Sequence, residues 1–133
     1  MTQHEMRRIA MQAIYLANQG NLTDAEEVCQ KALKALELKS FPDYSAEIVN
    51  GVLANKKELD GQLSNYLKKG WRLNRINEID LAILEVALYE MQNSKAIEPV
   101  AALNEALNLC DEFSSKESKK FINGLLANFI KKD

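Results

Sequence analysis

Apolar residues recur at helical spacing along almost the whole of this 133-residue chain. They lie three and four positions apart, and no stretch alternates apolar and polar residues for long enough to predict a strand. The segment from Glu78 to Gln92 is apolar on most of its sides. A helix of that kind is usually central, because several neighbours must cover it. The pattern therefore predicts an all-α protein built around this segment.

Helix breakers and capping residues divide the chain into six expected helices. Gly20 and Gly70 end two of them, and Pro99 suits the first turn of another. Thr23 with Glu26 predicts a capping box, and so does the run from Ser114 to Glu117. In chain order we expect helices from Met6 to Gly20, Thr23 to Leu36, about Tyr44 to Lys69, Glu78 to Gln92 with Asn77 as its cap, and Pro99 to Phe113. The run Ser114 to Glu117 opens a sixth helix, which continues through Ile130.

The order of the segments repeats within the chain. Residues 48–55 parallel residues 121–128 at an offset of 73, with identical Asn, Gly, Leu, Ala and Asn. We interpret this as two three-helix bundles packed as one compact domain over 1–133, an N-terminal bundle at about 1–69 and a C-terminal bundle at about 70–133. Glycine inside a helix costs about 1 kcal/mol relative to alanine. Gly51 and Gly124, which recur at the same place, are therefore expected at close helix crossings.

The sequence offers little material for catalysis or metal binding. It has one His and two Cys, no phosphate-binding glycine loop and no nucleophile elbow. His4 is expected to be solvated near a frayed terminus, whereas Cys29 and Cys110 fall in apolar stripes and are expected to be buried. We therefore predict a protein that is not an enzyme and uses no metal or cofactor. No secretory signal or membrane span is recognisable, which favours a cytoplasmic location.

Charge is unevenly distributed, although the net charge is only −2. Residues 61–75 carry four basic residues and no acid, residues 76–115 carry eight acids and one Lys, and residues 116–133 carry five Lys and two acids. The net charge excludes a polycation that coats nucleic acid through bulk charge. The uneven distribution permits two kinds of partner, phosphate on the basic side and a basic protein on the acidic side. Phe121 follows Lys119 and Lys120, so base stacking and core packing both remain open for its ring.

Four sequence blocks in order resemble the NusB family of bacterial transcription antitermination factors. They are Arg7-Arg8 with Gln12-Ala13-Ile14-Tyr15, Asp80 to Leu84 with Ala87 to Glu90, Ala102 to Ala106, and Ser118 with Lys120 to Leu126. The resemblance implies two three-helix bundles and an RNA-binding function. It also implies a small-subunit ribosomal protein, NusE, as partner, boxA RNA as ligand, and antitermination by RNA polymerase on ribosomal RNA operons.

The resemblance also implies which residues bind. The RNA-binding candidates, with Lys119 added for its charge, are Arg7, Arg8, Gln12, Lys119, Lys120 and Phe121. Tyr15 and Asp80 match positions that face the partner protein, although half-buried packing is an equal alternative for Tyr15. The chain has fewer N-terminal Arg residues than many members of the family, which predicts weaker intrinsic RNA affinity. The alternative functions are a protein–protein adaptor, a homodimer, and an accessory domain of an RNA-modifying enzyme.

Overall fold

A computed structural model of the chain describes residues 1–130, and within this range every regular element is a helix. The prediction of an all-α protein is therefore confirmed. The elements in chain order are α1 (Gln3–Gly20), α2 (Ala25–Ala35), α3 (Asp43–Ala54), α4 (Lys56–Ser64), the short 3₁₀ helix η1 (Leu73–Arg75), α5 (Glu78–Asn93), α6 (Pro99–Phe113) and α7 (Lys116–Ala127). None of the helices in this part of the chain is both long and apolar enough to cross a membrane.

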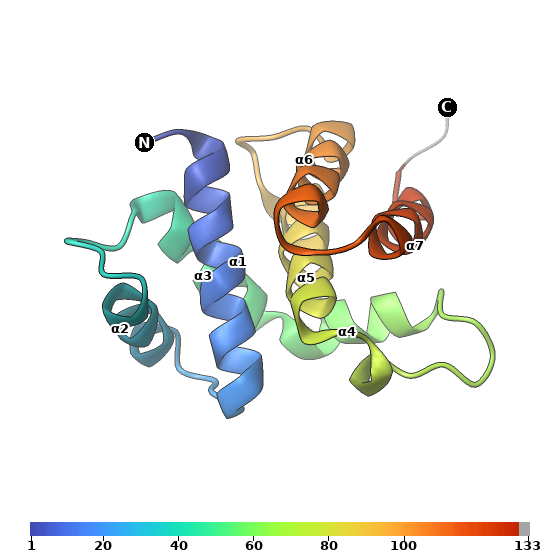
Figure 1. Ribbon diagram of the computed structural model, residues 1–133, viewed down its shortest axis with the longest axis horizontal. Helices are drawn as coiled ribbons and strands as arrows, with labels where there is room; N and C mark the ends of the chain where they lie inside the picture. Colours follow the sequence, from blue (N-terminus) through green and yellow to red (C-terminus); the bar gives the residue numbers. More distant parts are fainter. Residues whose placement is uncertain (131–133) are drawn as a thin grey trace.

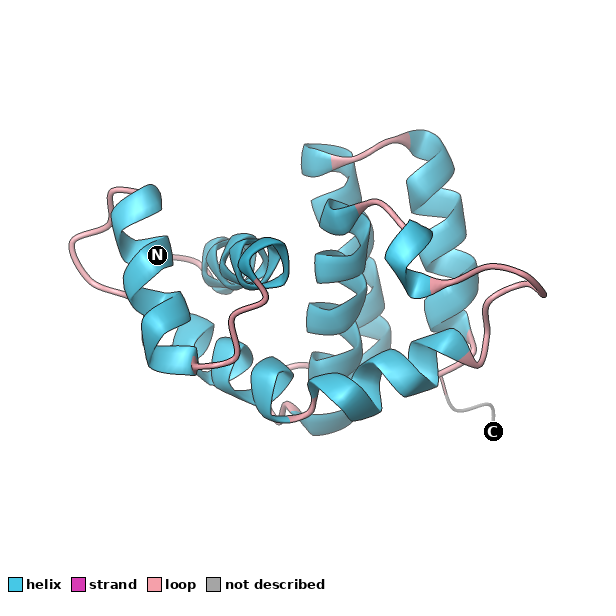
Figure 2. Ribbon diagram, turned by 90° about the horizontal axis from the view of Figure 1, so that it is seen from below, coloured by secondary structure: helices cyan, strands magenta, loops and turns pink. Residues whose placement is uncertain are grey.

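Helix α5 is the central element, as the apolar pattern predicted. In Figure 1, the group α1, α2 and α3 lies to the left of α5, whereas in the second group α6 overlaps the upper part of α5 and α7 lies to the right. Figure 2 shows the same arrangement from below, with no strand among the helices and loops. Eleven of the sixteen residues of α5 are buried. Because α5 packs against both groups of helices, the two groups share one hydrophobic core.

The expected long helix from Tyr44 to Lys69 is two helices, and that prediction is wrong. The break falls at Asn55, whose backbone at φ −112° and ψ 14° departs from helical geometry. The Asn55 side-chain amide donates to the carbonyl oxygen of Gly51 at 2.8 Å. An asparagine side chain that takes a backbone carbonyl offers the chain an alternative to continued helix. The second piece, α4, therefore turns to cross α5 at the end of the N-terminal group.

The ends of the other helices agree with the predictions in part. Asn77 caps α5, and Pro99 begins α6, as predicted. The capping residue of α2 is Asp24 and not Thr23, because the Asp24 carboxylate accepts the backbone N–H of Glu27 at 3.0 Å. Ser115 is the residue that caps α7. Of the two cysteines, Cys110 is buried as predicted, whereas Cys29 is only partly buried.

The two repeated glycines differ in their surroundings. A Cβ atom added to Gly51 would lie 2.1 Å from the Cε1 and Cζ atoms of the Tyr89 ring, so α3 crosses α5 closely there, as predicted. A Cβ atom added to Gly124 would have no other atom within 4 Å, so the same prediction for Gly124 is wrong. Only the glycine of α3 is required by packing.

This difference predicts opposite effects of the same substitution. Gly51→Ala should lower the free energy of unfolding by about 1–2 kcal/mol, because displacing the Tyr89 ring outweighs the gain in helix propensity. Gly124→Ala is the matched control and should raise stability by about 0.5–1 kcal/mol, because alanine favours the helix and meets no atom. Urea denaturation measures both. Equal effects of the two substitutions would contradict the crossing.

Candidate nucleic-acid interface

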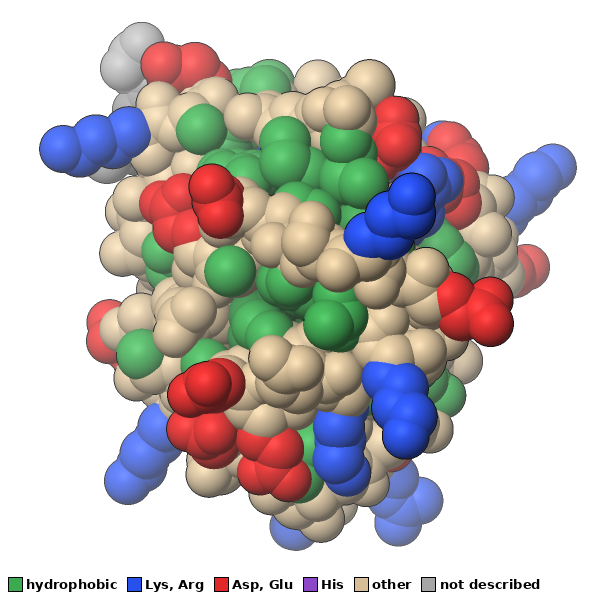
Figure 3. Space-filling model, turned by 90° about the vertical axis from the view of Figure 1, so that its left-hand side faces the viewer, with side chains coloured by type: hydrophobic (Ala, Val, Ile, Leu, Met, Phe, Trp, Pro, Cys, Tyr) green, Lys and Arg blue, Asp and Glu red, His purple; other side chains and the backbone are tan. Residues whose placement is uncertain are grey.

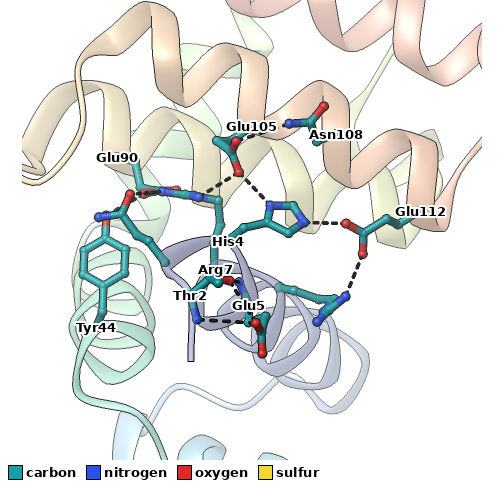
Figure 4. Close-up of polar contacts among 11 residues, drawn as sticks. Thr2, His4, Glu5, Arg7, Tyr44, Glu90, Glu105, Asn108 and Glu112 are labelled. Carbon is teal, nitrogen blue, oxygen red and sulfur yellow. Dashed lines mark hydrogen bonds and ion pairs between the residues drawn. The ribbon is translucent and has the colours of Figure 1, made fainter.

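Arg7, near the start of α1, is buried in an ion pair with Glu90 of α5. Its Nε donates to Glu90 Oε1 at 2.6 Å and its Nη2 donates to Glu90 Oε2 at 2.9 Å. The two side chains are 2% and 0% exposed. Figure 4 shows this pair at the meeting point of α1, α3, α5 and α6. Such two-point contacts between a guanidinium and a carboxylate are among the stronger hydrogen bonds in proteins.

Two further side chains complete this buried cluster. The Tyr44 hydroxyl donates to Glu90 Oε2 at 2.5 Å, and burial together with this bond raises the pKa of Tyr44 to about 12. Arg7 Nη1 donates to Glu105 of α6 at 3.0 Å. The guanidinium of Arg7 is thus fully engaged inside the protein. Its charge neutralises Glu90 and its side chain is buried, while its role in RNA binding stays a prediction.

His4 extends the charged contacts from α1 along α6 (Figure 4), and Arg8 adds a further contact. His4 Nδ1 lies 2.6 Å from Glu105 Oε2, and His4 Nε2 contacts Glu112. Arg8 Nη1 donates to Glu112 Oε2 at 3.1 Å. The prediction of a solvated His4 in a frayed terminus is therefore wrong. Thr2 and Glu5 form a capping box that orders this first turn of α1.

Lys119 of α7 contacts the same end of α6. Lys119 Nζ contacts the two carboxylate oxygens of Asp111 at 2.9 and 3.1 Å. Asp111 is the chain neighbour of Glu112, which holds Arg8. Arg8 and Lys119 therefore flank one acidic turn. Both are partly exposed, with 38% and 41% of their side-chain surface accessible.

The remaining RNA-binding candidates also lie at or near the surface. Lys120 is exposed and Gln12 is half-buried. Phe121 is half-buried against the hydrophobic core, and its ring centroid lies 6.2 Å from that of Trp71. We call Arg8, Lys119, Lys120 and Phe121 the α1–α7 edge. The face seen from the α2 side carries acidic and basic side chains interspersed around apolar areas (Figure 3).

Asp80 and Tyr15, the two partner-binding candidates, are placed differently. Asp80 is 4% exposed and accepts hydrogen bonds from the hydroxyls of Ser114 at 2.6 Å and Ser118 at 2.5 Å. It therefore holds the turn between α6 and α7, and its contact with a partner stays a prediction. Tyr15 is half-buried on α1, and its hydroxyl accepts from the amide of Gln19 at 2.7 Å.

A third buried acid of α5, Glu85, was not predicted. Lys56 Nζ donates to its Oε2 at 2.5 Å and to Asp60 at 3.0 Å, while Asn18 donates to its Oε1 at 2.7 Å. Glu85 is 0% exposed, and burial beside the Asp60 carboxylate raises the pKa of Glu85 to about 8. The sequence signal was available: an acid within a helix that is apolar on most sides must be paired when it is buried.

The described residues do not form an obvious catalytic or metal centre. No group of three or more His, Cys, Asp and Glu residues within 1–130 is arranged to hold a metal ion. The one His contacts two carboxylates. Burial, with Asp80 and Asp111 nearby, raises the pKa of the Cys110 thiol to about 11, so this thiol stays protonated at neutral pH.

Comparison with known proteins agrees with this arrangement. A model of the NusB family matches residues 4–131. Transcription antitermination protein NusB of Levilactobacillus brevis is 41% identical over 132 residues, which cover 98% of this chain and 93% of that protein. The protein of the same name from Lacticaseibacillus casei is 39% identical over 129 residues, covering 97% and 94%.

Solved structures show the same fold. T. maritima NusB is 25% identical and superimposes with a TM-score of 0.81, covering 96% of this chain and 89% of that one. A structure of the antitermination factors NusB and NusE in complex with dsRNA gives a TM-score of 0.80 at 18% identity, which shows a shared fold. These matches define a helical protein of the transcription antitermination class. The chain belongs to the NusB family, so the resemblance seen in its sequence blocks is confirmed.

The buried ion pair leads to a stability prediction. Arg7→Met should lower the free energy of unfolding by about 3–5 kcal/mol, because Glu90 would remain buried without its counter-charge. Replacing Glu90 by Gln in the same chain removes that charge and should restore much of the loss. A double-mutant cycle in urea measures the coupling between the two side chains. Additive effects of the single substitutions would contradict a direct pair.

The His4 contacts predict a specific pH dependence. Hydrogen bonding to Glu112, supported by Glu105 and opposed by burial, raises the pKa of His4 above its ordinary value of 6.5. The protonated ring is thus favoured by folding. Its contribution to stability should be complete below about pH 6.5 and should disappear as the pH rises through the raised pKa.

Because His4 is the single histidine, its ring protons can be followed by NMR without assignment of others. We expect a titration midpoint above 6.5 in the folded protein. In His4→Gln, the fall in unfolding free energy over that pH window should be absent. A midpoint at or below 6.5 would show that the two glutamates do not hold the ring in solution.

Proposed function

We propose that this chain is an RNA-binding transcription antitermination factor. In this proposal it binds boxA RNA together with the small-subunit ribosomal protein NusE, in the bacterial cytoplasm. The complex joins RNA polymerase and supports antitermination on ribosomal RNA operons. The observation that carries the proposal is the family match over residues 4–131. It is supported by Arg8 and Lys119, which pair with the adjacent acids Glu112 and Asp111 of α6.

The α1–α7 edge has suitable chemistry for single-stranded RNA. Such RNA is held by cations on its phosphates and by aromatic rings that stack on unpaired bases. Arg8 and Lys119 are paired with Glu112 and Asp111. Exposed ion pairs of this kind contribute only about 0–1 kcal/mol, so an RNA phosphate can replace the carboxylate at small cost. Arg7 supports the edge indirectly, because it fixes the start of α1.

The acidic turn between these cations also limits the affinity for RNA alone. Asp111 and Glu112 lie beside the positions where phosphates would approach and repel them. A basic ribosomal protein would neutralise such carboxylates, and residues 76–115 carry eight acids against one Lys. We therefore propose that partner binding increases RNA affinity. Tyr15, half-buried on α1, is the candidate we assign to the partner contact.

The proposal is tested by fluorescence anisotropy of a labelled boxA-like RNA. The protein is added alone and together with the ribosomal protein, first at low salt and then at increasing salt. We expect weak binding by the chain alone and tighter binding by the mixture. No binding in either mixture at low salt would overturn the proposal. Partner binding without any RNA binding would favour a protein–protein adaptor, and sedimentation of the free chain would reveal a homodimer.

Individual cations of the edge have a measurable signature. Arg8→Ala and Lys120→Ala should each weaken RNA binding and reduce the slope of log Kd against log salt by about 0.7, as expected for one lost contact to a single-stranded phosphate. Lys31→Ala is the matched control, because Lys31 is exposed on α2, away from the edge. A salt slope that is the same in all three variants would remove Arg8 and Lys120 from the RNA contacts.

A further inference from the structure

The segment between α4 and η1 exposes two large aromatic side chains. Tyr66 is 49% exposed and Trp71 is 56% exposed, and both line a surface groove of about 410 Å³. The opposite wall of the groove belongs to α7 and includes Lys120 and Phe121. Neighbouring exposed apolar side chains that line a groove are typical of binding sites. The wall formed by Tyr66, Lys68 and Trp71 is not among the RNA-binding candidates implied by the sequence blocks.

The rings are held in defined positions. Trp71 and Phe121 have centroids 6.2 Å apart and ring planes tilted by 32°. Tyr66 meets Phe129 edge to face at 5.0 Å and 77°. The turn before Trp71 uses Gly70 at φ +90°, a conformation that favours glycine. The backbone N–H of Trp71 donates to the backbone carbonyl of Lys68 at 2.9 Å. The turn therefore directs the indole toward α7 and leaves part of its surface free.

The charge around the groove favours a polyanion. Lys68 and Lys120 line it from its two sides. Residues 61–75 contain four basic residues and no acid, so this wall lacks the carboxylates that border Arg8 and Lys119. Aromatic rings between such cations match single-stranded nucleic acid, where bases stack and phosphates follow the basic groups. An apolar or acidic peptide would satisfy only one of these two features.

We propose that Trp71 is a base-stacking platform for RNA, with Lys68 and Lys120 holding the adjacent phosphates. The groove continues directly from the α1–α7 edge, because Lys120 and Phe121 belong to both. The bound strand then passes from α1 across the end of α6 and along α7 to the segment between α4 and η1. This inference rests on the proposed RNA-binding function and extends it to residues outside the family-matched RNA surface.

Trp71 is the one tryptophan of the chain, so its fluorescence reports on this groove alone. The experiment titrates the protein, with its ribosomal partner present, with a boxA-like single-stranded RNA. A second strand of the same length carries abasic positions and keeps every phosphate. We expect the first strand to quench Trp71 and the abasic strand to bind without comparable quenching. The partner protein alone serves as the baseline, in a variant without tryptophan if its own sequence contains any.

Substitutions provide an independent readout. Trp71→Ala should weaken binding of the boxA-like RNA by about 5- to 150-fold, the range expected for one lost stacked base. Trp71→Phe should restore most of the affinity, since a phenylalanine ring also stacks. Val100→Ala is the matched control, because Val100 is another exposed large apolar residue, 54% accessible, at the start of α6. Lys68→Ala should reduce the slope of log Kd against log salt, as is expected for Lys120→Ala.

The outcomes separate the two proposals. If RNA binds with normal affinity to Trp71→Ala and leaves Trp71 fluorescence unchanged in the native chain, the stacking platform is overturned while the RNA-binding function stands. Equal quenching by the abasic strand would also overturn it, because the effect would then come from phosphates. If no RNA binds with or without the ribosomal partner, both proposals fail.

Discussion

The ion pair between Arg7 and Glu90 is the interaction on which the arrangement of the two groups of helices depends. Glu90 is a fully buried acid on the central helix, and a buried carboxylate without a partner is strongly destabilising. Arg7 supplies the partner from α1, Tyr44 adds a hydrogen bond from α3, and Arg7 in turn reaches Glu105 on α6. One charged cluster therefore sets the positions of four helices relative to one another.

The other two buried acids of α5 act in the same way at different positions along the helix. Glu85 binds Lys56 and Asn18, and so joins α5 to α4 and α1. Asp80 binds the hydroxyls of Ser114 and Ser118, and so joins it to the α6–α7 turn. A mostly apolar helix can slide or rotate against apolar neighbours at modest cost, whereas a buried acid is satisfied in one position only. These three side chains thus specify the register of the core.

The candidate RNA surface is a consequence of this arrangement. With α1 and α7 both held against α6, Arg8 and Lys119 come to flank Asp111 and Glu112. The net charge of −2 conceals this edge, because Arg8 and Lys119 lie next to carboxylates. The groove lined by Lys68 and Trp71 is a separate basic area that shares Lys120 and Phe121 with the edge. An edge that mixes cations with acids gives weak attraction by itself. It is suited to assembly with a partner that removes the repulsion.

The sequence by itself determined the helical class, the central position of α5 and membership in the NusB family, because periodicity and ordered motifs are local properties of the chain. Only the tertiary structure decided which charges face water. Arg7 and Arg8 are neighbours, about 100° apart around α1, and the side chain that draws Arg7 inward lies 83 positions away. The burial of Asp80 likewise depends on a residue far away in the chain, Ser114. The different surroundings of Gly51 and Gly124 also follow from contacts between distant segments, because Tyr89 lies against Gly51 and no side chain lies against Gly124. The helix break at Asn55 was missed because a side chain that competes for a backbone carbonyl leaves the apolar period intact.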